Sequence, residues 1–140
     1  MKQIVILIFS AGCLIFTACR KKENDSSSIM GTWELTKISG QIIIDYPPGN
    51  GTKWKFTGSN YEFYRNDTLE KSGTYALISD NTVSESVCLV IPAGQYSERI
   101  VYDNRSDSTK VFIQVSGNKL SMIAGCYAYD GGSTQEYIRK

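Results

Sequence analysis

Apolar and polar side chains alternate with a period of two along most of this chain after residue 29, and this alternation constrains the fold more than any other feature. Trp54 and Phe56 alternate with lysines, and Tyr61 and Phe63 follow after the turn-forming segment 57–60. Successive side chains of a β-strand point to opposite faces, so this stretch predicts a hairpin with one aromatic face. No segment after residue 28 shows a sustained helical period with start and stop signals. The sequence therefore predicts an all-β domain.

The rest of the domain repeats this pattern of short strands and tight turns. A Gly-Asn step in the turn 116–119 separates two alternating runs, 110–115 and 120–123, and predicts a second hairpin. Eight to ten short strands joined by tight turns are typical of an up-and-down barrel or a sandwich. The other predicted strands are 32–38, 41–44, 69–78, 87–91, 97–102 and 134–139.

Two short features at the ends of this domain favour the barrel. Gly31 and Trp33 have the spacing of the Gly-x-Trp motif, and Arg139 lies near the end of the last predicted strand. The domain resembles a small bacterial lipocalin in its strand pattern and in these two ends. The resemblance implies an up-and-down antiparallel meander that closes into a small lipocalin-like β-barrel. It also implies barrel closure by Gly31, Trp33 and Arg139, with the cation stacked on the indole for about 0.5 to 2 kcal/mol. The alternative is that Trp33 is a core anchor of some other meander.

The first residues have the composition of a secretory signal peptide. Lys2 is followed by an apolar run at 4–9, and the small residues Thr17 and Ala18 come directly before Cys19. This arrangement resembles the processing box of bacterial lipoproteins, although Phe16 stands where leucine is usual. The resemblance implies that Cys19 is acylated, for example with palmitate, and becomes the new N-terminus.

Cys13 is a rival lipidation site because small residues also precede it. Apolar residues 14–16 follow Cys13, whereas the polar and charged residues 20–28 follow Cys19 and would leave a solvated terminus. An ordinary cleaved secretory peptide and a retained membrane anchor are the alternatives. Processing at Cys19 divides the chain into a signal peptide (1–18), a flexible acylated tether (19–28) and a barrel domain (29–140). We then expect a lipoprotein of the Gram-negative envelope, held by its acyl chains on the periplasmic face or the cell surface of the outer membrane.

The charge balance bears on the possible partners. The chain has 15 lysines and arginines and 14 acidic residues, and removal of 1–18 takes away one cation, Lys2, which leaves 14 of each. Nucleic-acid binding requires a basic face that offsets phosphates. We expect a monomer with no nucleic-acid partner.

Cys88 and Cys126 are the thiols that remain after processing and acylation. In an oxidising envelope they are expected to form a disulfide if their strands are adjacent. Two free buried thiols or a redox pair are the alternatives, although the Cys-x-x-Cys spacing of redox sites is absent.

The composition offers little for catalysis because the chain has no histidine. The commonest general base, the histidine-dependent triads and most zinc sites are thereby excluded. A carboxylate pair remains an open alternative because distances between acidic side chains are invisible in sequence. We expect no enzyme, no catalytic residue, no metal and no cofactor.

The chain has nine tyrosines, and aromatic rings on several predicted strands would line a barrel interior. A small apolar or amphipathic ligand is therefore the predicted partner, and the alternative for these rings is ordinary core packing. The loop 46–51 resembles the loop that covers a lipocalin mouth, and a rigid surface loop is the alternative. The residues predicted to contact the ligand are Tyr61, Phe63, Tyr64, Tyr75 and Tyr102.

A second hypothesis is a protein-interaction or inhibitory module with a filled barrel and no small ligand. Loops 45–52, 93–96 and 127–133 combine tyrosine with glycine or asparagine, a mixture that suits protein contacts. A structural envelope protein without a specific ligand is the third alternative.

Overall fold

The computed structural model describes residues 28–140. The predicted signal peptide, Cys19 and all of the predicted tether except Ser28 lie outside the described residues. No helix within the described range is long and apolar enough to cross a membrane. In chain order the elements are β1 (Gly31–Ser39), β2 (Ile43–Asp45), β3 (Lys53–Thr57), β4 (Asn60–Arg65), β5 (Thr68–Ser79), α1 (Val83–Val87), β6 (Glu98–Tyr102), β7 (Val111–Ser116), β8 (Lys119–Ala124), the 3-10 helix η1 (Tyr127–Tyr129) and β9 (Ser133–Arg139).

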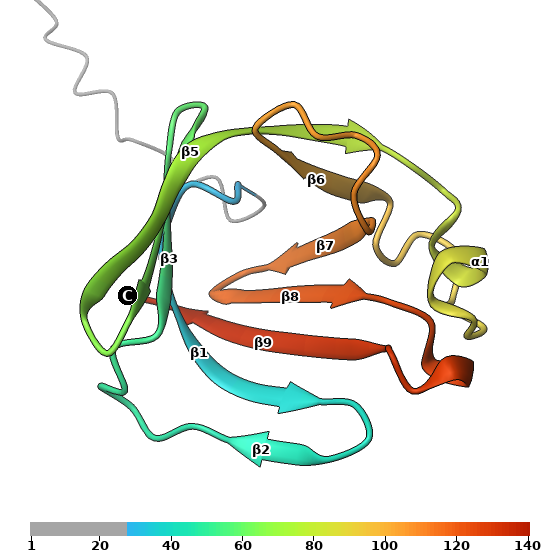
Figure 1. The fold of residues 1–140 in the computed structure, drawn as a ribbon, viewed down its shortest axis with the longest axis horizontal. Coiled ribbons are helices and arrows are strands. Elements are labelled where there is room, and N and C mark those ends of the chain that lie inside the picture. The colour runs from blue at the N-terminus through green and yellow to red at the C-terminus, as the bar shows by residue number, and fades with distance from the viewer. Residues whose placement is uncertain (1–27) are drawn as a thin grey trace, which may run out of the picture.

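Eight strands close into an antiparallel barrel. Strands β3 to β8 each pair with the next strand in chain order, and β1 pairs with both β3 and β9. The ninth strand, β2, pairs with the C-terminal part of β1, and in Figure 1 this hairpin lies along the lower edge of the barrel. The closure between β1 and β9 confirms the predicted up-and-down barrel and rules out the sandwich.

The long strand β5 bends the sheet around the interior. Its first half pairs with β4 and its second half with β6, and Figure 1 shows it curving along the left side and over the top. Near this bend Asp103, the residue after β6, connects β4 to β5 by accepting hydrogen bonds from the hydroxyl of Tyr61 and the backbone nitrogen of Thr74, each at 2.9 Å. A Cβ atom on Gly73 would lie 2.0 Å from Oδ1 of Asp103, so this close approach requires glycine.

Trp33 and Arg139 lie together, at the start of β1 and the end of β9. Trp33 has no exposed surface, and its Nε1 donates a 2.6 Å hydrogen bond to the carbonyl oxygen of Ile29. The guanidinium carbon of Arg139 lies 4.2 Å from the centre of the Trp33 ring. The same guanidinium donates hydrogen bonds to the carbonyls of Met30 and Ser28. The segment that precedes β1 is thus fastened to the barrel by the last strand.

A short helix covers part of the outside of the barrel, and it ends where the predicted strand at 87–91 would begin. Val83 and Val87 of α1 are buried with Phe112 and Ile123, which lie on the outer face of β7 and β8. The helix ends at Cys88, whose φ of 57° is left-handed. The predicted strand at 87–91 is therefore wrong, because two valines four residues apart form one helical turn, which is too short to show a period.

A disulfide joins Cys88, directly after α1, to Cys126, directly before η1. Its Cα atoms are 5.0 Å apart and its partners are 38 residues apart in sequence. The two cysteines lie in loops, whereas the sequence analysis had placed Cys88 on a strand. The bond holds the helical cover against the connection between β8 and β9.

Candidate ligand-binding cavity

Aromatic side chains from four strands partly fill the barrel interior, and Trp54 lies at their centre. Trp54 stacks on Phe56 with ring centres 5.8 Å apart and on Tyr102 at 5.3 Å. Its ring centre is 5.6 Å from that of Tyr61 and 4.7 Å from that of Phe63. The alternation along β3 and β4 brings these rings together because Trp54 pairs with Phe63 and Phe56 with Tyr61.

Two hollows adjoin at Trp54 and Gln135, which line both of them. The larger has a volume of about 490 Å³ and the smaller about 170 Å³. The other residues around the larger hollow are Leu35, Ile38, Tyr46, Thr52, Phe63, Arg65, Asn66, Lys71 and Tyr137. Those around the smaller one are Tyr102, Val111, Met122, Ala124 and Ser133.

A chain of hydrogen bonds crosses this part of the barrel. Nε1 of Trp54 lies 3.1 Å from the hydroxyl oxygen of Tyr137 and donates to it. The Tyr137 hydroxyl in turn donates to Oε1 of Gln135 at 2.5 Å. Tyr137 and Gln135 are two residues apart on β9 and so face the same side of the sheet. These hydrogen bonds fix side chains of β3 and β9, two strands that are distant in sequence.

Tyr102 and Tyr137 are neutral inside the barrel. Burial raises the pKa of Tyr102 far above its usual range, and the nearby Tyr137 and Tyr61 raise it further. Burial likewise raises the pKa of Tyr137, against the lowering effect of its hydrogen bond with Trp54. The Tyr102 hydroxyl oxygen is buried and has no hydrogen-bond partner among the described residues. Such unpartnered buried groups are uncommon and require a physical explanation.

The loop between β2 and β3 forms one wall of the larger hollow. Tyr46 and Thr52, near the two ends of this loop, line the hollow. Asn50 fixes the loop by donating hydrogen bonds to the carbonyls of Leu35 at 2.9 Å and Pro47 at 2.8 Å. Glu34, which is 4% exposed, accepts a hydrogen bond from the backbone of Gly49 at 2.9 Å. The loop that resembled a lipocalin lid is therefore anchored to β1 beside the hollow.

The structure brings four of the five predicted ligand residues to the barrel interior. Phe63 lines the larger hollow and Tyr102 the smaller one. Tyr61 and Tyr75 instead pack in the core, where the ring centre of Tyr75 lies 5.0 Å from that of Phe56.

The prediction that Tyr64 lines the cavity is wrong. Tyr64 lies on the outer face, where its hydroxyl donates to Glu62 at 2.8 Å and Lys53 lies over its ring at 5.3 Å. The reason is the period of the strand, because Tyr64 is adjacent to the inward-facing Phe63 and must point the other way.

Gln135 and Tyr46 were not singled out from the sequence as cavity residues. Gln135 shares a face with Tyr137 on the last strand, but its neighbours Thr134 and Glu136 are also polar, so no contrast in the sequence marks it as inward-facing. Tyr46 stands in a proline-containing loop, and no periodic signal marks a loop residue that turns inward. Both were invisible without the register of β1, β3 and β9.

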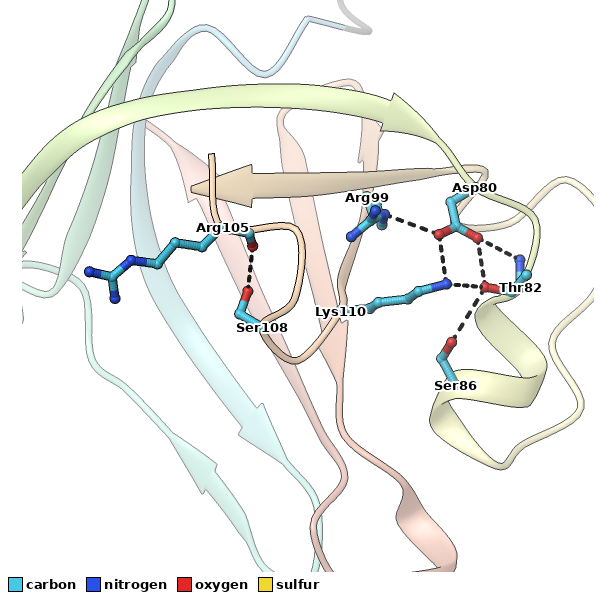
Figure 2. Close-up of polar contacts among 7 residues, drawn as sticks. All are labelled: Asp80, Thr82, Ser86, Arg99, Arg105, Ser108 and Lys110. Atoms are coloured by element: carbon cyan, nitrogen blue, oxygen red, sulfur yellow. Dashed lines mark hydrogen bonds and ion pairs between the residues drawn. The ribbon is translucent and has the colours of Figure 1, made fainter. Parts of the chain in front are cut away.

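A second group of polar side chains lies on the outside of the barrel next to α1 (Figure 2). Asp80 accepts a 2.6 Å hydrogen bond from the hydroxyl of Thr82, and it forms ion pairs with Arg99 at 3.1 Å and Lys110 at 3.0 Å. The hydrogen bonds from Thr82, with the nearby Lys110, lower the pKa of Asp80 to about 2. Lys110 also donates to Thr82 at 2.8 Å, so its amine is engaged in holding the start of α1. This cluster attaches the helix to β6 and β7.

A third hollow, of about 480 Å³, lies where the 92–97 loop meets outward-facing side chains of β7, β8 and β9. Its lining combines the polar residues Gln114, Ser121 and Glu136 with Leu120 and Ile138. The hydroxyl of Tyr96 makes a 2.7 Å hydrogen bond with that of Ser121 and holds the loop to β8.

Comparisons of the chain with protein-family models, with curated protein sequences and with solved structures found no match.

Proposed function

We propose that this protein binds a small amphipathic molecule inside its barrel, as the lipocalin resemblance implies, and that it performs no catalysis. The observation that carries the proposal is the hollow of about 490 Å³ inside the barrel. Ligand cavities have volumes of about 300 to 1,000 Å³ and combine apolar walls with a few placed polar groups. Trp54, Phe63 and Tyr46 supply the apolar walls, and Gln135 and Lys71 are among the polar groups.

We further propose that acyl chains on Cys19 hold this barrel at the outer membrane of a bacterial envelope. The support comes from the residues before and after Cys19 and from the disulfide between Cys88 and Cys126. Structural disulfides persist in oxidising compartments such as the periplasm and the cell surface. A barrel near a membrane would meet amphipathic molecules at high local concentration.

A cavity-blocking variant tests the proposed function, with 1-anilinonaphthalene-8-sulfonate as the fluorescent probe. Ile38 lines the larger hollow, so Ile38→Trp places an indole where the probe would bind. Ile43 is 66% exposed on β2, so Ile43→Trp is the matched control. We expect saturable binding by the wild type and the control, and at least a fivefold weaker affinity for Ile38→Trp. Equal binding by all three proteins, or none by the wild type, would contradict the proposal.

Protein contact is the second candidate function, and a group of exposed apolar residues favours it. Val90 is 97% exposed and Tyr129 is 85% exposed, and each lies within three residues of a cysteine of the disulfide. A photo-crosslinking amino acid at Val90 tests this candidate in intact cells, with the exposed Thr57 as the control position. A discrete crosslinked product at Val90 alone would support protein contact, and equal products at both positions would count against it.

A further inference from the structure

We infer that the ligand held in this barrel carries an uncharged hydrogen-bond acceptor, such as a ketone, ester or amide carbonyl, which docks on the side-chain amide of Gln135. The inference rests on the proposed function and adds the chemical class of the ligand. It follows from the direction of the hydrogen bonds that join Trp54, Tyr137 and Gln135.

The direction of these hydrogen bonds is fixed by Trp54. The indole nitrogen of Trp54 can donate a hydrogen bond but cannot accept one. The Tyr137 oxygen, 3.1 Å away, is therefore the acceptor, and its own proton remains available for the next bond. That proton points to Gln135 at 2.5 Å, so the atom of Gln135 that receives it is the carbonyl oxygen.

The amide nitrogen of Gln135 is consequently available to donate a hydrogen bond to a ligand in the cavity. Gln135 lines both hollows, and no hydrogen bond within residues 28–140 occupies its Nε2. A primary amide nitrogen has two protons and accepts nothing, so it recognises an acceptor on the ligand. The hydroxyl of Tyr102, on the wall of the smaller hollow, is a second polar group without a hydrogen-bond partner in the described part of the chain.

The lining of the smaller hollow indicates that the acceptor is uncharged. Its residues include Val111, Met122 and Ala124, and none of those that line it carries a charge. Lys71 and Arg65 line the larger hollow, and Arg65 is paired with Glu70 at 3.2 Å. An ionised group in the smaller hollow would lose its hydration without gaining a counter-ion. A carbonyl group loses less and gains a hydrogen bond from Gln135.

The test compares two probes of the same shape, 2-acetylnaphthalene and 2-isopropenylnaphthalene, which differ by a carbonyl oxygen in place of a methylene group. Both are titrated against the full chain carrying Cys19→Ser, so that no acyl chain competes for the barrel, and against the same chain with Gln135→Met. We expect the substitution to weaken binding of the ketone about fivefold, as loss of one hydrogen bond predicts, and to leave binding of the hydrocarbon unchanged.

The outcomes separate this inference from the proposed function. If both probes bind the chain with Gln135 and the substitution changes their affinities equally, the inference is wrong and the proposed function stands. If neither probe binds that chain, both are wrong.

The carbonyl stretching frequency of the bound ketone provides a measurement that needs no folded variant. A shift to lower frequency than in a non-hydrogen-bonding solvent is the expected result. A frequency equal to that in the solvent would overturn the inference.

Discussion

Replacement of Trp33 by alanine removes the side chain that packs between the two ends of the sheet. Trp33 is fully buried, and its loss leaves a cavity bordered by Arg139. The carbonyl of Ile29, a residue that is 4% exposed, also loses its hydrogen-bond donor. We therefore expect a large loss of stability.

The expected loss is about 4 kcal/mol. Truncation of a buried tryptophan to alanine costs about 3 to 5 kcal/mol. The contacts with Arg139 and Ile29 favour the upper part of that range, although coupled contacts do not add in full. A single domain has a free energy of unfolding of about 5 to 15 kcal/mol, so the variant would keep about 1 to 11 kcal/mol and stay folded in the absence of urea.

Urea unfolding followed by circular dichroism and by tryptophan fluorescence, which Trp54 supplies in the variant, measures this loss. With a slope of about 1.5 kcal/mol per molar urea, the midpoint of unfolding should fall by about 2 to 3 M. Tyr129→Ala is the control, because this ring is 85% exposed and its removal should change stability by less than about 0.5 kcal/mol. A loss below about 1 kcal/mol for Trp33→Ala, with an unchanged slope, would refute the role assigned to the indole.

Three further predictions concern the outside of the barrel. Cys126→Ser should lower the free energy of unfolding by about 3 to 4 kcal/mol, because the disulfide closes a loop whose ends are 38 residues apart, and urea unfolding measures this. The pKa of Asp80 is lowered to about 2, so its ionised form stabilises the folded state above pH 4. This contribution, about 1 to 2 kcal/mol after solvent screening, should disappear as the pH falls from 4 to 2 in the wild type, and stability curves of Asp80→Asn should lack that part of the slope. Tyr64→Phe should leave the affinity for 1-anilinonaphthalene-8-sulfonate unchanged because Tyr64 faces outward, and a loss above twofold would contradict its placement.

The barrel was predictable because its signals are local. Alternation of side chains along each run marks a strand with one buried face, and the turns between the runs allow neighbouring strands to pair. The resemblance at Gly31, Trp33 and Arg139 then favoured closure of the sheet, and in the structure β1 and β9 pair from Trp33 to Ser39. The alternation of apolar and polar side chains also predicts correctly which faces of β3 and β4 point into the barrel.

The errors arose where a local signal was short or was overridden. Val83 and Val87 show one helical turn, so α1 was not predicted and its end was taken for a strand. The aromatic ring of Tyr64 favours a ligand contact, but Tyr64 directly follows the inward-facing Phe63, so the alternation of the strand places it on the outer face.

The cavity residues depend on distances that no local pattern contains. The hydrogen bonds from Trp54 to Tyr137 and from Tyr137 to Gln135 require the register of three strands, one of which is far from the others in sequence. The hollow itself depends on how much of the barrel interior the aromatic rings fill. The alternation of side chains in the sequence does not contain this volume.

Native mass spectrometry of the Cys19→Ser chain, exported from bacteria and purified gently, tests the central claim most directly. We predict a discrete mass beyond that of the polypeptide, which organic solvent extracts and which belongs to a molecule with a carbonyl group. The Ile38→Trp variant should lose this additional mass, whereas Ile43→Trp should retain it. If the Cys19→Ser chain with Ile38 and Ile43 unchanged shows the mass of the polypeptide alone, the account is contradicted. That result would favour a barrel that acts through its loops.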